Sequence, residues 1–279
     1  MADRIAPREK FRAIAELPDY QIDLAEAALW IAAEEQPGLH PAPWLDRLDE
    51  LGEQLRRRLR GVRDEIDRLD CLNELLFLEE GLRGNSENYY DPRNSYLNEV
   101  LHRRLGIPIS LAVVCIEVGK RAGVPLEGVG FPGHFLLRLA RHPEIVVDPF
   151  DQGRLLTMDD CQEMLSKVTR GSVGFDPALL RPVGSRQILQ RMLNNLRGIH
   201  LHRGEHEKTI SVLDRLLLLD PEDPGPLRDR GVLHIRWGDP ERGVEDLEAY
   251  LTAADGAVAD QEEIAYLISE TRRRMTLVN

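Results

Sequence analysis

The chain has 279 residues, of which 42% are hydrophobic and 30% charged, a mix typical of a globular protein with one large or two smaller domains. Its 36 Lys and Arg residues stand against 48 Asp and Glu residues, which gives a formal net charge of −12. This negative excess argues against a nucleic-acid-binding protein, because such binding needs positive side chains that neutralise phosphates.

The distribution of apolar residues and cysteines indicates where the protein resides. No stretch approaches the roughly 20 apolar residues that a membrane span needs, and residues 1–8 are too polar for a signal peptide. A sparse, odd set of three cysteines without metal-ligand spacing fits a reducing compartment. The sequence also has no Gly-rich phosphate-binding loop. We therefore expect a cytoplasmic protein with no cofactor and no nucleic-acid or membrane partner.

The first part of the chain is predicted to be mainly helical, in segments with apolar residues at three- and four-residue steps. These helices are expected over residues 9–35 (interrupted at Pro18), 45–59, 71–82 and 97–104. Between the last two, residues 83–97 are rich in turn formers and show no periodicity. We expect that segment to be a loop.

A buried helix followed by a small sheet is predicted in the middle of the chain. Pro108 fits the first turn of this helix, where its missing N–H is harmless. The helix is largely apolar, runs to about residue 121 and ends at Gly123, a plausible cap. Short β-prone runs follow, separated by turn residues, at 126–131, 134–139 and 145–150. They predict an antiparallel meander, followed by a helix near 158–167.

The C-terminal part contains an internal repeat. Gly204 recurs as Gly238, and Leu213 as Leu247, at an offset of 34 residues, which is the period of tetratricopeptide repeats. Each unit is expected to be a helical hairpin with its turn at the glycine. A capping helix over 264–275 would close the array.

One region combines the start of a buried helix with a histidine and an aspartate in the predicted strands. His134 and Asp148 lie there, and we expect them to pair. An aspartate can orient an imidazole for acid–base chemistry, although such a pair can also serve only the fold. The histidines at 200, 202 and 206 lack carboxylate or thiol partners at ligand spacing, so no metal site is predicted.

The sequence around this pair resembles the SirB family. The resemblance rests on NSYLNEVL at 94–101, RLGIPISL at 104–111, GFPGHFL at 130–136 and DPF at 148–150, and it extends over nearly the whole chain. It implies an α+β fold: a helical N-terminal region and a transglutaminase-like, papain-like core with a small antiparallel sheet, over residues 1–180. An all-α tetratricopeptide-type domain would follow over 185–279.

The same resemblance implies a catalytic pattern that this chain matches only in part. The transglutaminase group has a cysteine at a helix start, a histidine on a strand and an aspartate before proline on the next strand. His134 and Asp148 match the last two, but the cysteine position holds Pro108. Proline offers neither a nucleophilic atom nor a backbone N–H for an oxyanion hole.

Other polar residues near this pattern have two interpretations each. Ser110 and Cys115 are weak nucleophile candidates. Ser110 projects from a different side of the helix than position 108, and Cys115 lies almost two turns further along, in the expected core. The loop residues Tyr89, Tyr90 and Asn94 either line a cleft or order the loop, and their turn-rich surroundings favour the second role.

Two functional hypotheses follow. The first is a non-catalytic protein-binding or scaffold protein whose partner is another protein or a peptide, since helical repeats form concave binding surfaces. The second is an amidase or transamidase-like hydrolase that uses Ser110 or Cys115 with His134 and Asp148. They differ in whether a nucleophile lies within hydrogen-bond reach of the histidine.

Overall fold

Two compact units make up the protein. The computed structural model describes residues 2–254 and 259–278, and the chain divides into the units Met1–Met192 and Leu193–Asn279. The boundary falls within helix α8 (Ser185–His202). In the described part of the chain, no helix combines the length and the apolar character that crossing a membrane would require.

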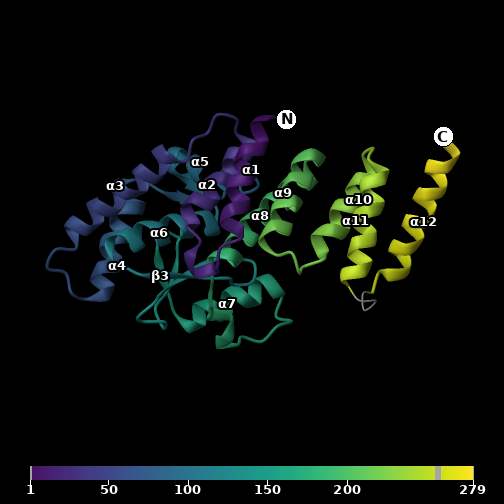
Figure 1. Cartoon of the computed structure of the whole chain (residues 1–279). Helices are drawn as coiled ribbons and strands as arrows, with labels where there is room; N and C mark the ends of the chain where they lie inside the picture. Colours follow the sequence, from purple (N-terminus) through teal and green to yellow (C-terminus); the bar gives the residue numbers. More distant parts are fainter. Residues whose placement is uncertain (1, 255–258, 279) are drawn as a thin grey trace. The chain divides into compact units, whose positions relative to one another are not determined.

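The first unit begins with a series of helices (Figure 1). They are α1 (Ala2–Ala15), α2 (Leu24–Glu35), α3 (Ala42–Arg58) and α4 (Glu65–Asn73), and α4 continues as a π-helical turn, Glu74–Glu79. Pro18 separates α1 from α2, as the sequence predicts. The helix expected over 71–82 starts earlier, because the Asp64 carboxylate accepts the Ile66 N–H at 2.9 Å and caps a helix from Glu65.

A short two-stranded element leads into the central helix. Strand β1 (Arg83–Gly84) pairs in parallel with β2 (Leu105–Gly106), and α5 (Leu97–Arg103) lies between them in the chain. Helix α6 (Pro108–Ala122) then follows. Pro108 occupies its first position, and Gly123 ends it at a φ of 83°, so both predicted helix boundaries are confirmed.

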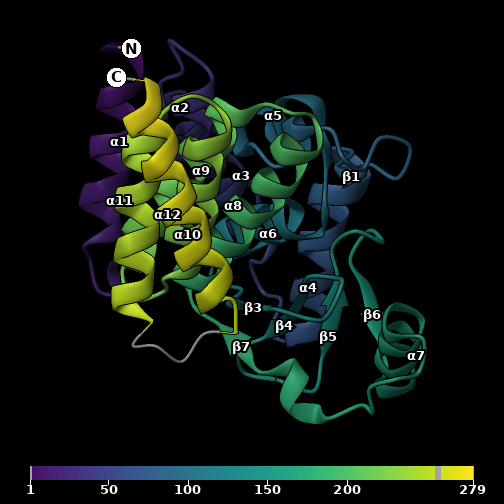
Figure 2. The same ribbon diagram turned by 90° about the vertical axis from the view of Figure 1, so that its right-hand side faces the viewer.

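An antiparallel sheet follows α6. Its strands are β3 (Leu126–Val129), β4 (Leu136–Leu139), β5 (Val146–Asp148), β6 (Arg154–Leu156) and β7 (Pro182–Val183), in the order β6-β5-β4-β3-β7 (Figure 2). The predicted meander β3-β4-β5 is confirmed, whereas β6 and β7 were not predicted. Strand β4 begins at Leu136, so His134 lies in the preceding turn. The sequence-based prediction that His134 lies on a strand is wrong.

The two faces of the sheet pack against different helices. Leu126 lies beside Gly119 of α6 on one face. The other face contributes Val129, Leu136 and Val146 to a buried cluster that includes Cys161 of α7 (Met158–Thr169). This alternation follows from the two-residue period of a strand, and it leaves the strand ends and connecting turns to carry polar residues.

The second unit consists of antiparallel helices. After the end of α8 come α9 (His206–Leu219), α10 (Gly225–Arg236), α11 (Pro240–Ala253) and α12 (Gln261–Val278) (Figure 1). The two hairpin turns contain Gly204 and Gly238, with φ values of 69° and 106°, which favour glycine. The predicted fold class, an α+β core followed by tetratricopeptide-type helices, is confirmed.

Helices α10 and α11 cross closely at Gly231. A Cβ at this position would lie 2.8 Å from Leu247 Cγ and 2.9 Å from the Gly243 carbonyl oxygen. We expect Gly231→Ala to destabilise the protein by about 1–3 kcal/mol through overpacking. The matched control is Gly198→Ala on α8, where a Cβ meets nothing within 4 Å, and it should stabilise by about 0.5–1 kcal/mol. Urea unfolding of both variants measures this, and a stabilised Gly231→Ala variant would contradict the close crossing.

Candidate functional site

His134 and Asp148 form a hydrogen-bonded pair at one end of the sheet. His134 Nε2 lies 2.9 Å from Asp148 Oδ1, and the two side chains are 17% and 6% exposed. Within residues 2–254 and 259–278, Nδ1 of this imidazole has no hydrogen-bond partner. A carboxylate in this position fixes the orientation of the ring, so that the other nitrogen can accept or donate a proton.

Tight turns hold both side chains in place. His134 follows Gly133, whose φ is 68° and where a Cβ would come within 2.7 Å of a side chain of α7, so this turn requires glycine. Asp148, the last residue of β5, also accepts the Phe150 N–H at 2.9 Å. Its carboxylate therefore organises the turn after the strand as well as the imidazole.

Phe150 connects the pair to the start of α6. Its ring lies edge-on to the His134 imidazole, with ring centroids 6.1 Å apart. The Phe150 ring also lies against Gly84, where a Cβ would be only 2.5 Å from a ring carbon. Gly84 pairs with Gly106, which precedes the N-cap residue of α6, Ile107. The pair and the helix start therefore belong to the same region, as the transglutaminase-like pattern requires.

Position 108, at the start of α6, offers no attacking atom. Pro108 is the first residue of α6 and is buried. Its ring nitrogen carries no hydrogen, so it cannot donate to an oxyanion either. The backbone there is helical and regular, since Leu111 donates to the Ile107 carbonyl at 3.1 Å. The sequence-derived alignment of Pro108 with a cysteine position stays a prediction.

Ser110 is fully buried and its hydroxyl is engaged with backbone. It accepts the Ile107 N–H at 3.0 Å and donates to the Asn94 carbonyl at 2.6 Å. No hydrogen bond joins this hydroxyl to His134 in the part of the chain that the structure describes. Ser110 thus secures the first turn of α6 and ties it to the preceding loop.

The three cysteine thiols have raised pKa values. Burial raises the pKa of the Cys115 thiol to about 12, and it raises the pKa of Cys71 and Cys161 as well. A thiol with a raised pKa is a poor nucleophile near neutral pH, because the thiolate is the reactive species. Cys115 is 1% exposed and lies in the apolar middle of α6.

We therefore expect Cys115 to resist thiol reagents in the native protein. In a Cys71→Ser variant, Ellman's reagent at pH 7 should titrate almost no thiol until denaturant is added, because Cys115 and Cys161 are both buried. A Cys71→Ser/Cys115→Ala variant serves as the control for the signal from Cys161. Fast native labelling that disappears with Cys115→Ala would identify a reactive cysteine.

The loop between β1 and α5 has a buried anchor and exposed rings. Asn94 is 0% exposed, and its amide bonds to Asn85, Asn88 and Tyr89. Tyr89 is 37% and Tyr90 71% exposed, and their rings contact each other edge-on. The Tyr89 ring also contacts Phe150, with centroids 6.1 Å apart. Asn94 has the contacts of a loop-ordering residue, whereas Tyr89 reaches the surroundings of His134.

Arg191 also contacts the turn that holds the histidine. Its Nη2 donates to the carbonyl oxygens of Phe131 and His134, at 2.9 and 2.5 Å. Arg191 was not singled out from the sequence, and Phe150 entered only as part of the DPF motif at 148–150. Arg191 lies on α8, far along the chain, and no local pattern there indicates that it meets the Pro132-Gly133 turn.

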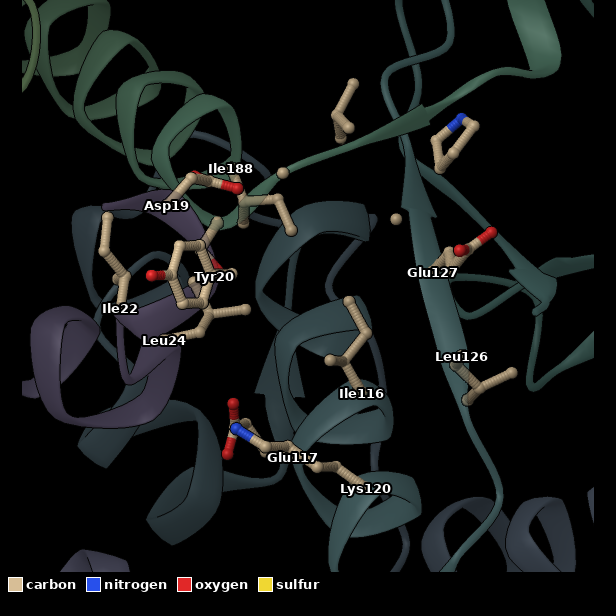
Figure 3. Close-up of a pocket in the computed structure, with 15 residues that line it drawn as sticks. Asp19, Tyr20, Ile22, Leu24, Ile116, Glu117, Lys120, Leu126, Glu127 and Ile188 are labelled. Atoms are coloured by element: carbon tan, nitrogen blue, oxygen red, sulfur yellow. The ribbon is translucent and has the colours of Figure 1, made fainter. Parts of the chain in front are cut away.

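A separate cavity of about 400 Å³ lies between the N-terminal segment, α6 and β3 (Figure 3). Ile22, Ile116 and Leu126 provide apolar walls, and Glu117 and Lys120 lie at one end. Neither His134 nor Asp148 lines it. In the described part of the chain, no three His, Cys, Asp or Glu side chains are grouped as a metal ion would require.

Comparison with known proteins gives two family matches and several relatives. The transglutaminase-like superfamily matches residues 42–194, and a tetratricopeptide repeat family matches residues 196–273. A UPF0162 protein of Xylella fastidiosa (strain 9a5c) is 39% identical over 245 residues, covering 86% of this chain and 87% of the relative. A UPF0162 protein of Pseudomonas aeruginosa is 35% identical over 232 residues, covering 83% and 85%.

A more distant likeness extends to eukaryotes. F-box only protein 21 of Homo sapiens is 34% identical over 182 residues, which are 61% of this chain and 28% of that protein. No solved structure matches. The first match covers α6 and the sheet, and the second covers the helices in which the 34-residue repeat was predicted. The chain, with its tetratricopeptide repeats, thus belongs to the transglutaminase-like superfamily and, within it, to the SirB-like family of UPF0162 proteins.

Proposed function

We propose that this protein is a non-catalytic protein-binding or scaffold module of the cytoplasm. The observation that carries the proposal is Pro108 at the first position of α6, where acyl-transfer chemistry needs a nucleophile and an N–H donor. Two further observations support it. The Ser110 hydroxyl is hydrogen-bonded to backbone groups, and the Cys115 thiol is buried.

The second unit supplies the binding role in this proposal. Tetratricopeptide repeats generally mediate contacts between proteins, and stacked helical hairpins offer an extended surface to a partner. The cytoplasmic location is supported by free cysteines, which suit a reducing compartment.

The second candidate function is an amidase or transamidase-like hydrolase. The observation in its favour is the His134–Asp148 pair at 2.9 Å, with Nδ1 without a partner in the described residues. An oriented imidazole can act as a general base. It then needs a nucleophile from Ser110, from Cys115 or from water.

Affinity capture tests the proposed function. The intact chain, immobilised and exposed to a bacterial lysate, should retain a defined protein that also binds after both components are purified. A chain without the second unit, residues 193–279, should retain less of it, provided that circular dichroism shows the shortened chain to be folded. If the purified pair shows no binding, or if the intact chain turns over acyl or amide substrates, the proposal is wrong.

A further inference from the structure

Arg191 is a half-buried cation without a carboxylate partner in the described residues. No Asp or Glu side chain of the described residues forms an ion pair with it. By contrast, Arg138 on strand β4 is paired with Glu127 at 2.7 Å. Burial lowers the pKa of Arg191, and the nearby Tyr89 phenol is the group that opposes this shift. Removing a guanidinium from water is unfavourable unless hydrogen bonds or an anion compensate for it.

The hydrogen bonds that Arg191 makes use only one of its nitrogens. Nη2 donates to the Phe131 and His134 carbonyls, and the guanidinium carbon lies 5.5 Å from the centroid of the Phe135 ring. Nε and Nη1 have no acceptor among the described residues, and neither atom is fully buried from solvent. Since a guanidinium has five N–H groups in a planar fork, three donors remain for a ligand.

Tyr89 and Phe150 lie beside the His134 turn that Arg191 contacts. Burial raises the pKa of the Tyr89 phenol, so it stays protonated near neutral pH and can donate a hydrogen bond. In the described part of the chain this hydroxyl has no hydrogen-bond partner. The Tyr89 ring contacts Phe150, which in turn contacts His134, so an aromatic surface adjoins the turn whose carbonyls Arg191 binds.

We propose that Arg191 and Tyr89 form a subsite for a peptide carboxylate beside the His134–Asp148 pair. Arginine binds a carboxylate through two parallel N–H donors, and the rings of Tyr89 and Phe150 suit an apolar neighbour of that carboxylate in the peptide. This inference rests on the proposed protein-binding function and specifies the chemistry of its partner. The carboxylate comes from a peptide's C-terminus or from an acidic side chain, which present the same group.

Titration calorimetry with four N-acetylated peptides tests the subsite on the full chain. The peptides are Ala-Ala-Phe-Ala and Ala-Glu-Phe-Ala, each with a free and with an amidated C-terminus. A peptide with the preferred carboxylate should bind about 10- to 100-fold more tightly than the neutral Ala-Ala-Phe-Ala amide. The two singly charged peptides then show which source of carboxylate the site prefers.

Two variants and a matched control locate the binding. Arg191→Gln should weaken the preferred peptide about 10- to 100-fold, and Tyr89→Phe, which removes only the hydroxyl, about 3- to 10-fold. Arg181→Gln makes the same charge change at an exposed arginine and should leave the affinity unchanged. If Arg191→Gln does not fold, the peptide affinity of Tyr89→Phe alone decides whether the subsite exists.

Several results would overturn the subsite. These are equal affinity for all four peptides, no binding of any peptide at millimolar concentration, parent affinity in the folded Arg191→Gln and Tyr89→Phe variants, or an equal loss in Arg181→Gln. The outcome is separate from that of the proposed function. A chain that hydrolyses an ester yet binds carboxylates through Arg191 would refute the non-catalytic role and keep the subsite.

Discussion

The purified chain should hydrolyse p-nitrophenyl acetate and glutamine amides no faster than its His134→Ala variant. Acyl transfer of this type needs an attacking atom at the helix start, a base beside it and donors for the oxyanion. The pair at 2.9 Å supplies the base and its orienting carboxylate. Pro108 supplies neither of the other two. Removing one oxyanion donor costs on the order of 10²–10³ in rate, and removing the nucleophile costs on the order of 10⁶.

Replacing Pro108 with cysteine should create measurable esterase activity where the parent has none. The change introduces a thiol and a backbone N–H at the N-terminus of α6, where the helix dipole favours a thiolate. The activity should disappear in the Pro108→Cys/His134→Ala double variant. Pro108→Ser tests whether the thiol itself matters, and we expect it to stay inactive.

The opposite result is equally clear. Turnover by the parent that is lost in His134→Ala would show that the chain is an enzyme. Cys115→Ala then distinguishes the candidate nucleophiles: loss of activity identifies the thiol, and full activity points to Ser110 or to water. A denaturation curve for each variant separates lost chemistry from lost structure.

The sequence predicts α6 and the repeats well because local chemistry determines their ends. Pro108 suits a first helical position, and Gly123 and Gly238 supply the positive φ that their turns adopt. Strands β6 and β7 were missed, since β7 has only two residues and forms through pairing with β3. Strand β7 depends on a partner that is distant in sequence. Strand β6 pairs with the nearby β5 but has only three residues, too few to show a periodicity.

The site is predictable to a similar extent. A His and an Asp in consecutive strand segments indicated a pair, and they lie 2.9 Å apart. The position of His134 was misjudged, because β4 starts only after the Pro132-Gly133 turn. Arg191 could not be found from the sequence, since its contact with that turn depends on how α8 packs against the sheet. Long-range contacts of this kind follow from tertiary packing and have no local pattern.

Asn94→Ala should destabilise the protein by about 3–5 kcal/mol, a large effect for a loop residue. The Asn94 amide accepts from Asn85 Nδ2 at 3.0 Å and donates to the carbonyls of Asn88 and Tyr89 at 2.8 and 3.2 Å. Alanine cannot replace any of these bonds. The buried Asn85 amide would lose its acceptor, and an unsatisfied buried polar group costs about 1–3 kcal/mol.

The same substitution at Asn88 is the matched control. Asn88 lies in the same loop but is exposed, and among the described residues its side chain makes no hydrogen bond, so Asn88→Ala should change stability by no more than about 0.5 kcal/mol. Urea unfolding measures both variants, and amide hydrogen exchange over residues 85–95 should become faster only in Asn94→Ala. Because the Asn94 side chain holds the loop that places Tyr89 beside Phe150, Asn94→Ala should also weaken the binding of carboxylate peptides, provided that the variant remains folded. Unchanged unfolding and unchanged exchange in Asn94→Ala would show that the loop is held by its backbone and not by this amide.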